Sequence, residues 1–147
     1  MPNAYASLRI HWTTPIGVFL LSGFSLNPFV WIAILGLMIA HELGHAILAR
    51  RYRLRVISID VTPIGGVCRL EGDPTLHEAA VVAWGGVLAQ GVLLLLALLV
   101  KPIVHVVAFG LLDDVFDILI RSNLILMALN LLPIEPLDGA TAWRVFR

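Results

Sequence analysis

Two histidines four positions apart, with a glutamate directly after the first, are the residues in this chain best suited to chemistry. They stand in the run His41-Glu42-Leu43-Gly44-His45. On an α-helix, residues i and i+4 lie on one face, so both imidazoles can bind a single Zn²⁺ ion. Zinc lowers the pKa of a bound water toward neutrality, and a neighbouring glutamate can take the proton of that water and pass it to a leaving amine. The spacing therefore predicts a hydrolytic zinc site.

The residues around this motif argue against an accidental match. On a soluble helix the same spacing can arise as a solvated surface pattern. Here the motif follows an apolar run, Ile34-Leu35-Gly36-Leu37-Met38-Ile39-Ala40. Ionisable side chains inside an apolar span are costly and persist mainly where they pair, bind ions or do chemistry. One metal ion satisfies all three polar side chains, so we predict a metal site.

A catalytic zinc ion usually has three protein ligands and one open position. Two carboxylates compete for the third ligand position, Asp138 and Glu135, both in a proline-containing segment after the last apolar stretch. We favour Asp138, because counting the expected membrane crossings returns it to the side of His45. The remaining candidates have simpler explanations as helix caps, interfacial histidines or an apolar filler: His77, Glu78, His11, His105 and Cys68.

The composition of the chain is that of an integral membrane protein. Of 147 residues, 59% are hydrophobic and only 14% are charged, and the mean hydropathy is +0.93. Soluble domains carry about 25% charged residues, which excludes a soluble protein. The formal net charge is zero with no basic block, so no nucleic-acid partner is expected. The single cysteine excludes an internal disulfide and a multi-cysteine zinc site.

The apolar pattern predicts an all-α membrane protein, a multi-helix transmembrane bundle with a small membrane-associated β-hairpin. Long helices are expected at 29–49, 79–100 and 118–132, with Lys101-Pro102 ending the second. The segments 14–26 and 103–112 are too short to cross as helices, and Asp113, Asp114 and Asp117 form an acidic connector. Alternating or β-branched residues predict strands at 56–61 and 67–70, and a short strand or interfacial segment at 8–12. We expect a single domain over 1–147.

The charges flanking the first long helix predict its orientation. Arg50, Arg51, Arg53 and Arg55 follow it directly, and basic residues favour the cytoplasmic side. The two later helices then cross outward and back. Asp138 therefore returns to the cytoplasmic side, near the end of the helix that carries His41 and His45.

Two motifs in this chain resemble those of the site-2 protease family of intramembrane zinc metalloproteases. The first is the run from His41 to His45, and the second is Asn130-Leu131-Leu132-Pro133-Ile134-Glu135-Pro136-Leu137-Asp138-Gly139. The segment 46–56 resembles the family's continuation of the metal helix, and 63–67 resembles its glycine-containing strand. The resemblance covers most of the chain.

The resemblance implies a complete functional assignment. His41, His45 and Asp138 would bind one Zn²⁺ per chain, and Glu42 would activate the water. The substrates would be membrane proteins cleaved within or near their transmembrane segments, often signalling precursors such as anti-sigma factors. Gly65 and Gly66 would pair with an unwound substrate by β-addition. The protein would be a multi-pass component of a bacterial or archaeal cell membrane with its site toward the cytoplasm, and a homo-oligomer stays open.

The chain also departs from the family pattern. Where relatives often have Ala-Gly-Pro-x-Ala-Asn, this chain has Gly85-Gly86-Val87-Leu88-Ala89-Gln90. Gln90 would then replace the asparagine as an amide donor to the oxyanion, whereas Asn130 either orders the turn before Asp138 or faces the substrate. No PDZ-like or CBS-like domain is expected. The end at Arg147 is consistent with a minimal enzyme or a truncated core.

Two other functions compete with proteolysis. A membrane zinc-binding or scaffolding protein would keep the metal site without turnover, but the intact Glu42 argues against it. A zinc transporter would need ligands distributed across the membrane, whereas the strong ligands here cluster toward one side. We therefore expect a metalloendopeptidase.

Overall fold

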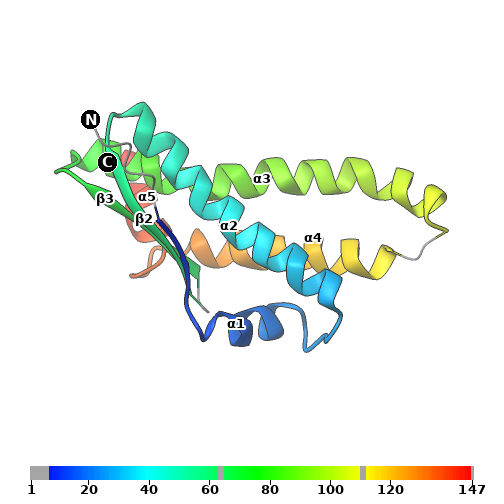
Figure 1. Cartoon of the computed structure of the whole chain (residues 1–147). Coiled ribbons are helices and arrows are strands. Elements are labelled where there is room, and N and C mark those ends of the chain that lie inside the picture. Colours follow the sequence, from blue (N-terminus) through cyan, green and yellow to red (C-terminus); the bar gives the residue numbers. More distant parts are fainter. Residues whose placement is uncertain (1–6, 63–64, 110–111, 147) are drawn as a thin grey trace.

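Long helices run along the length of the molecule, and a small sheet covers one end of them (Figure 1). The computed structural model describes residues 7–62, 65–109 and 112–146. In chain order the elements are β1 Ser7–Ile10, α1 Thr14–Leu21, α2 Pro28–Arg51, β2 Arg55–Thr62, β3 Gly65–Glu71, α3 Leu76–Val107, α4 Asp113–Asn130, α5 Gly139–Ala142 and the 3₁₀ helix η1 Trp143–Phe146. The C-terminus of α2, the N-terminus of α3 and the C-terminus of α4 all lie at the sheet end.

Local signals in the sequence define both ends of α2. The side chain of Asn27 accepts a hydrogen bond from the Phe29 N–H at 2.9 Å, and Pro28 occupies the first helical position. At the other end, the Leu54 N–H donates to the Ala49 carbonyl at 3.0 Å, with Arg53 at a φ of +60°. This is a Schellman-type end built on a non-glycine residue. The expected helix at 29–49 is confirmed.

Helix α3 is longer than the sequence predicts. It begins in a capping box between Thr75 and Glu78. It then continues through Pro102 to Val107, so the prediction that Lys101-Pro102 ends it was wrong. Proline removes one backbone donor, a loss that helices in apolar surroundings tolerate where neighbours compensate. Here an ion pair between Lys101 and Asp117 ties the added turns to α4.

The expected acidic connector is the first part of α4. Asp113 and Asp114 lie in the first turn of this helix, where the helix dipole favours negative charge. A second pair between the His105 Nδ1 and the Asp113 carboxylate, at 2.6 Å, joins the ends of α3 and α4. The helix therefore spans Asp113–Asn130 in place of the expected 118–132. The predicted start of α4 was wrong because Asp113, Asp114 and Asp117 were interpreted as part of a loop.

The sheet confirms the expected hairpin and adds a third strand. Its order is β1-β2-β3, with β1 parallel and β3 antiparallel to β2. Val61 pairs with Gly66 and Thr62 with Gly65, close to the hairpin turn. Residues 63 and 64 of the expected glycine-containing segment lie outside the described residues. Segment 8–12 contributes β1.

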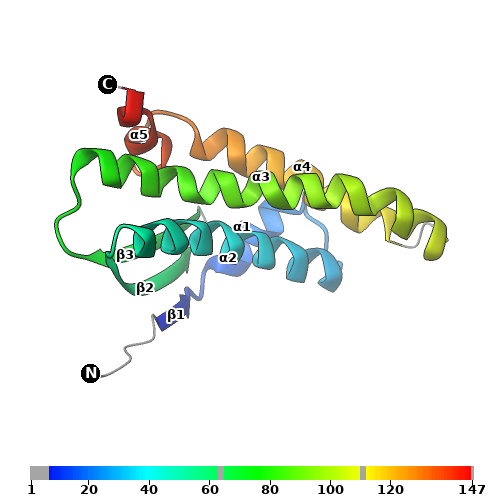
Figure 2. The same ribbon diagram turned by 90° about the horizontal axis from the view of Figure 1, so that it is seen from above.

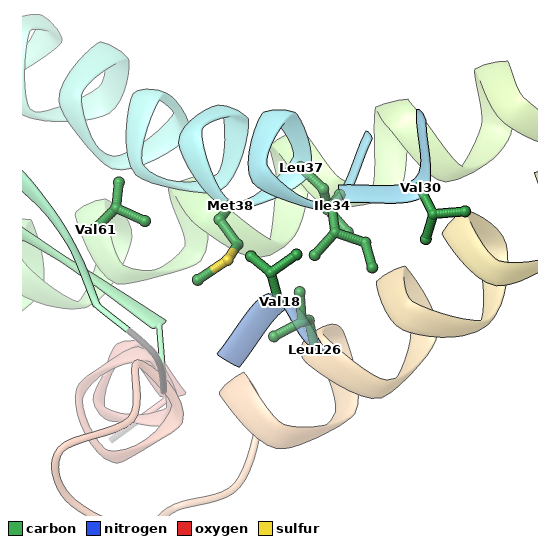
Figure 3. Close-up of a cluster of buried hydrophobic side chains, with 7 residues drawn as sticks. All are labelled: Val18, Val30, Ile34, Leu37, Met38, Val61 and Leu126. Carbon is green, nitrogen blue, oxygen red and sulfur yellow. The ribbon is translucent and has the colours of Figure 1, made fainter. Parts of the chain in front are cut away.

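A buried apolar cluster joins α1, α2, α4 and β2. Val18, Ile34, Met38, Val61 and Leu126 meet there (Figure 3). Seen from above, α3 runs beside α2 and α4 (Figure 2). By length and composition, α2 and α3 are candidate membrane spans. The described fold is thus mostly helical with a three-stranded sheet.

Helices α2 and α3 approach so closely that their contact excludes side chains. A Cβ atom added to Gly85 would lie 2.7 Å from the Gly44 carbonyl carbon and 2.9 Å from the His45 nitrogen. Small residues permit this packing between membrane helices. The contact places His45 directly against α3.

We expect Gly85→Ala to destabilise the fold by about 1–3 kcal/mol, because the methyl group separates the two helices. Gly91→Ala in the same helix is the matched control, since its Cβ would meet only the Met127 Cε at 4.0 Å. Both changes bring the same gain in helix propensity. Denaturant titration of the detergent-solubilised variants compares them, and equal stabilities would contradict a close α2–α3 contact.

Candidate active site

Two imidazoles meet on the buried side of α2. His41 and His45 are each 5% exposed, and Glu42 is 1% exposed. The Nε2 atoms of the two histidines lie 3.0 Å apart. This is the geometry that the i, i+4 spacing predicts on a helix.

The segment after α4 brings a carboxylate to the same point. The Oδ2 atom of Asp138 lies 2.9 Å from the His41 Nε2 and 3.2 Å from the His45 Nε2. Indole N–H groups hold this segment in place: Trp143 donates to the Leu131 carbonyl at 2.7 Å, and Trp84 donates to the Ala142 carbonyl at 3.0 Å. Residues distant in sequence therefore converge at one site.

The environment keeps Asp138 ionised. Its burial by itself raises the pKa of the carboxyl group, but the adjacent His41 and His45 rings outweigh this effect and hold the pKa below its usual range. A carboxylate between two imidazole nitrogens is a ligand set that zinc accepts.

The three ligand atoms fit a zinc ion in size and chemistry. They form a triangle with sides of 3.0, 2.9 and 3.2 Å. Ligands at about 2.0–2.1 Å from a tetrahedral zinc lie about 3.3 Å apart. Glu42 also lies in a cluster with both histidines that could hold a metal, but its Oε1 is 3.8 Å from the His41 Nε2. Asp138 is therefore the better third ligand.

Both histidines are oriented through their other ring nitrogen. The His45 Nδ1 donates to the Val82 carbonyl at 2.8 Å, and the His41 Nδ1 donates to the Gln90 Oε1 at 3.1 Å. Because each Nδ1 donates its proton, the Nε2 atom of each neutral ring carries no proton and can bind a metal. The sequence reasoning missed Val82, whose backbone role carries no side-chain signal.

Gln90 lies behind His41, where it is fully buried. It lines neither of the two larger cavities beside the ligand atoms. The Gln90 Oε1 accepts from the His41 ring, whereas its Nε2 has no hydrogen-bond partner among the described residues, and Gln90 lines a small cavity of about 10 Å³ together with His41, Gly66 and Asn130. The expected donation of this amide to an oxyanion stays a prediction. The adjacent Gly86 is also required, since a Cβ atom there would lie 2.6 Å from the His41 ring nitrogens.

We expect Gln90→Leu to weaken zinc binding about 10–100-fold, as is usual when the group that orients a metal-bound histidine is lost. Gln90→Glu keeps an acceptor for the His41 Nδ1–H and should recover part of this loss. Competition with a chromophoric chelator measures both affinities. Unchanged affinity in Gln90→Leu would contradict the orienting role.

Glu42 is a buried carboxylate without a hydrogen-bond partner among the described residues. The main chain of Gly66 in β3 packs against it so tightly that a Cβ atom at Gly66 would overlap the carboxylate. A side chain here would displace Glu42. An unpaired carboxylate beside two imidazoles is free to accept a proton from an incoming molecule.

Two cavities open beside the ligand atoms. One of about 80 Å³ is lined by His41, Gly66, Asn130 and Asp138 among others, and one of about 240 Å³ by Glu42, His45 and Asp138 among others. The Asn130 Nδ2 lies 3.4 Å from the His41 Nε2. Asn130 therefore faces the site. The backbone of Gly65, at the start of β3, pairs with Thr62 of β2.

The other candidates lie away from the ligand atoms or lack the chemistry. Glu135 is exposed, and Glu78 caps α3. His11 contacts Thr13. Cys68 lines the larger cavity, where burial and the nearby Glu42 raise the pKa of its thiol to about 11.

Sequence comparisons identify related proteins. No protein-family model matches the chain. It is 34% identical over 130 residues to stage IV sporulation protein FB of Bacillus subtilis, covering 77% of this chain and 43% of that protein. It is 27% identical over 143 residues to a zinc metalloprotease of Methanocaldococcus jannaschii, covering 93% of this chain and 41% of that protein. The chain thus spans less than half the length of these curated relatives.

A solved structure shares the fold. The site-2 protease from Methanocaldococcus jannaschii matches 95% of this chain and 66% of its own, with a TM-score of 0.69 and 22% sequence identity. Together with the two motifs, the converging ligand atoms and the sequence relatives, this likeness supports the site-2 protease family for this chain.

Proposed function

We propose that this chain is the zinc-dependent core of an intramembrane protease, which hydrolyses peptide bonds within or near transmembrane segments of membrane proteins. One observation carries the proposal. The Asp138 carboxylate, from the segment after α4, closes a ligand triangle with His41 and His45 directly beside the unpaired carboxylate of Glu42.

Three residues would hold one zinc ion per chain: His41, His45 and Asp138. Zinc, when bound, lowers the pKa of a water molecule and polarises a peptide carbonyl. The Val82 carbonyl and Gln90 keep the two imidazoles in the tautomer that binds metal. These contacts fix the orientation of both rings.

Glu42 acts as the general base and then as the general acid. Its unpaired oxygens accept the proton of the attacking water, and the same carboxyl group delivers a proton to the departing amide nitrogen. The Asn130 side chain, at the open side of His41, donates to the developing oxyanion of the substrate. Gln90 keeps its contact with His41 throughout.

The substrate binds as an extended strand. A transmembrane helix hides its carbonyls in its own hydrogen bonds, so it must unwind before cleavage. In the sheet order, β3 has one unpaired edge among the described strands. Gly66 and Val67 of β3 line both cavities. This edge can receive an unwound segment by β-addition beside Glu42, with Gly65 at its start.

The protein crosses the membrane several times, with α4 as a third crossing. Two of the acidic residues near the start of α4 are paired with Lys101 and His105, which reduces the cost of placing them near the membrane. The arginines at and after the end of α2 favour the cytoplasmic side for the site. A bacterial or archaeal cell membrane fits the organisms of both relatives.

The test is cleavage by the purified chain. Zinc-loaded protein is reconstituted with a panel of single-span membrane proteins, and fragments are identified by mass spectrometry. We expect cuts within or near the spans that disappear with a chelator and return with zinc. Stoichiometric zinc without cleavage of any panel member would instead support a zinc-binding scaffold.

A further inference from the structure

The larger cavity beside the ligand atoms, of about 240 Å³, reaches from the site to the space between β3 and the first turns of α3. We call it the side-chain pocket. Glu42, His45 and Asp138 line it on the side of the site. The strand and the helix contribute walls without charge: Cys68, Leu70, Ala79, Val82 and Ala83. A segment bound at the zinc ligands therefore lies directly beside this pocket.

Alternate residues of β3 face the side-chain pocket. A Cβ atom on Gly66 would overlap the Glu42 carboxylate, so this face of the strand is turned toward the site. Successive side chains of a strand point to opposite faces. Cys68 and Leu70 therefore share the face of Gly66, and both line the pocket, whereas Arg69 between them is exposed. Because Cys68 is two positions from Gly66, a substrate strand paired with β3 presents to the pocket a side chain within two residues of the peptide bond at Glu42.

The size and chemistry of the side-chain pocket suit a large apolar side chain. A cavity of about 150 Å³ in a protein interior is enough to bind benzene, and this pocket is larger. Its α3 wall is made of small residues at helical spacing, including Ala79 and Ala83. Cys68 is half-buried, and its thiol is uncharged because burial and Glu42 raise its pKa to about 11. The described residues that line the pocket include no lysine or arginine, so an acidic substrate side chain finds no cation to pair with there.

We propose that the side-chain pocket selects the substrate: it takes a leucine, methionine or phenylalanine within two residues of the scissile bond, and Cys68 and Ala79 limit the size of that side chain. This inference rests on the proteolytic function proposed above and names the feature that a cleavable segment carries. Alanine would leave most of the pocket empty, and aspartate would bring a second carboxylate next to Glu42. One methylene group more or less in an apolar pocket changes kcat/KM by about 10–200-fold, so the selection should be measurable.

The first experiment varies the substrate around its cut. A single-span protein that the zinc-loaded chain cleaves is changed to alanine, leucine, phenylalanine or aspartate at each position within two residues of the mapped cut. We expect one position where leucine or phenylalanine raises kcat/KM at least about tenfold over alanine and where aspartate lowers it. Ala79→Leu narrows the pocket and should abolish or reverse this preference at unchanged zinc content. Ala128→Leu, at an exposed position of α4 that does not line the pocket, should keep it. An unchanged preference in Ala79→Leu would overturn the proposal.

A second experiment detects occupancy of the pocket without turnover. Cys68 is the single cysteine of the chain, so its alkylation, followed by mass spectrometry at mildly alkaline pH, reports on the pocket alone. Zinc-loaded Glu42→Gln is mixed with a synthetic alanine-rich span that a central Gly-Pro pair unwinds, with phenylalanine or alanine next to that pair.

We expect the phenylalanine span to protect Cys68 at a concentration at least about tenfold lower than the alanine span. Equal protection by the two spans, or no protection by either, would overturn the proposal. Selective protection by the phenylalanine span, in a chain that cleaves no panel member, would support the pocket as a binding site and reject the proteolytic function. The two proposals can therefore fail separately.

Discussion

Replacement of Glu42 by glutamine is expected to abolish peptide-bond hydrolysis while the zinc content stays at one ion per chain. The amide has nearly the size of the carboxylate but cannot accept a proton from water. General acid–base catalysis contributes about 10²–10⁴-fold to the rate, so the loss should be at least of this size. The rate of fragment formation from a co-reconstituted single-span protein and metal analysis of the same sample measure the two effects.

Glu78→Gln is the matched control for this change. Glu78 is an exposed carboxylate in the capping box of α3, so the same chemical change there should leave cleavage intact and cost only a little stability. Cleavage by Glu42→Gln at the rate of the unmodified chain would show that another group is the base. Loss of zinc in Glu42→Gln would instead indicate that Glu42 is a metal ligand.

Asp138→Ala should lower zinc affinity by more than about 100-fold, because it removes a ligand and not merely a group that orients one. Without Asp138 the site keeps only the two imidazoles as ligands. The Asp138 Oδ2, which lies within 3.2 Å of the Nε2 atoms of both rings, is the third ligand atom. Activity should fall in parallel with zinc occupancy. Chelator competition gives the affinity, and fragment analysis at saturating zinc separates poor binding from poor catalysis.

Glu135→Ala is the control for this second change. Glu135 lies three residues earlier in the same segment but is exposed. We expect full zinc affinity in Glu135→Ala. Zinc loss in Glu135→Ala together with retention in Asp138→Ala would reverse the assignment of the third ligand.

The structure confirms the predictions that depend on residues close together in the sequence. It contradicts predictions that depend on contacts between different helices. Helix α2 and the hairpin agree with the predictions because their caps and β-branched residues act on near neighbours. The ends of α3 and α4 were wrong for the opposite reason. Pairs such as Lys101 with Asp117 join residues on different helices, and no local pattern reports them.

The position of Gln90 shows a second limit of prediction from the sequence. Helices that are apolar around most of their circumference carry little information about which side faces a neighbour. The sequence therefore suggested an amide at the site without showing whether it contacts substrate or ligand. Packing through Gly44 and Gly85 sets the rotation of α3, and with it the place of Gln90 behind His41 and of Asn130 at the open side.

By itself, the sequence determined the membrane class, the paired imidazoles with their glutamate, and the family, because composition and i, i+4 spacing are local properties of the chain. Only the tertiary structure brought the Asp138 carboxylate to the two imidazoles while leaving Glu135 exposed, and placed Gly66 against Glu42. These features depend on the path of a loop and on the rotation and spacing of packed helices, which arise from contacts between residues 20 to 100 positions apart.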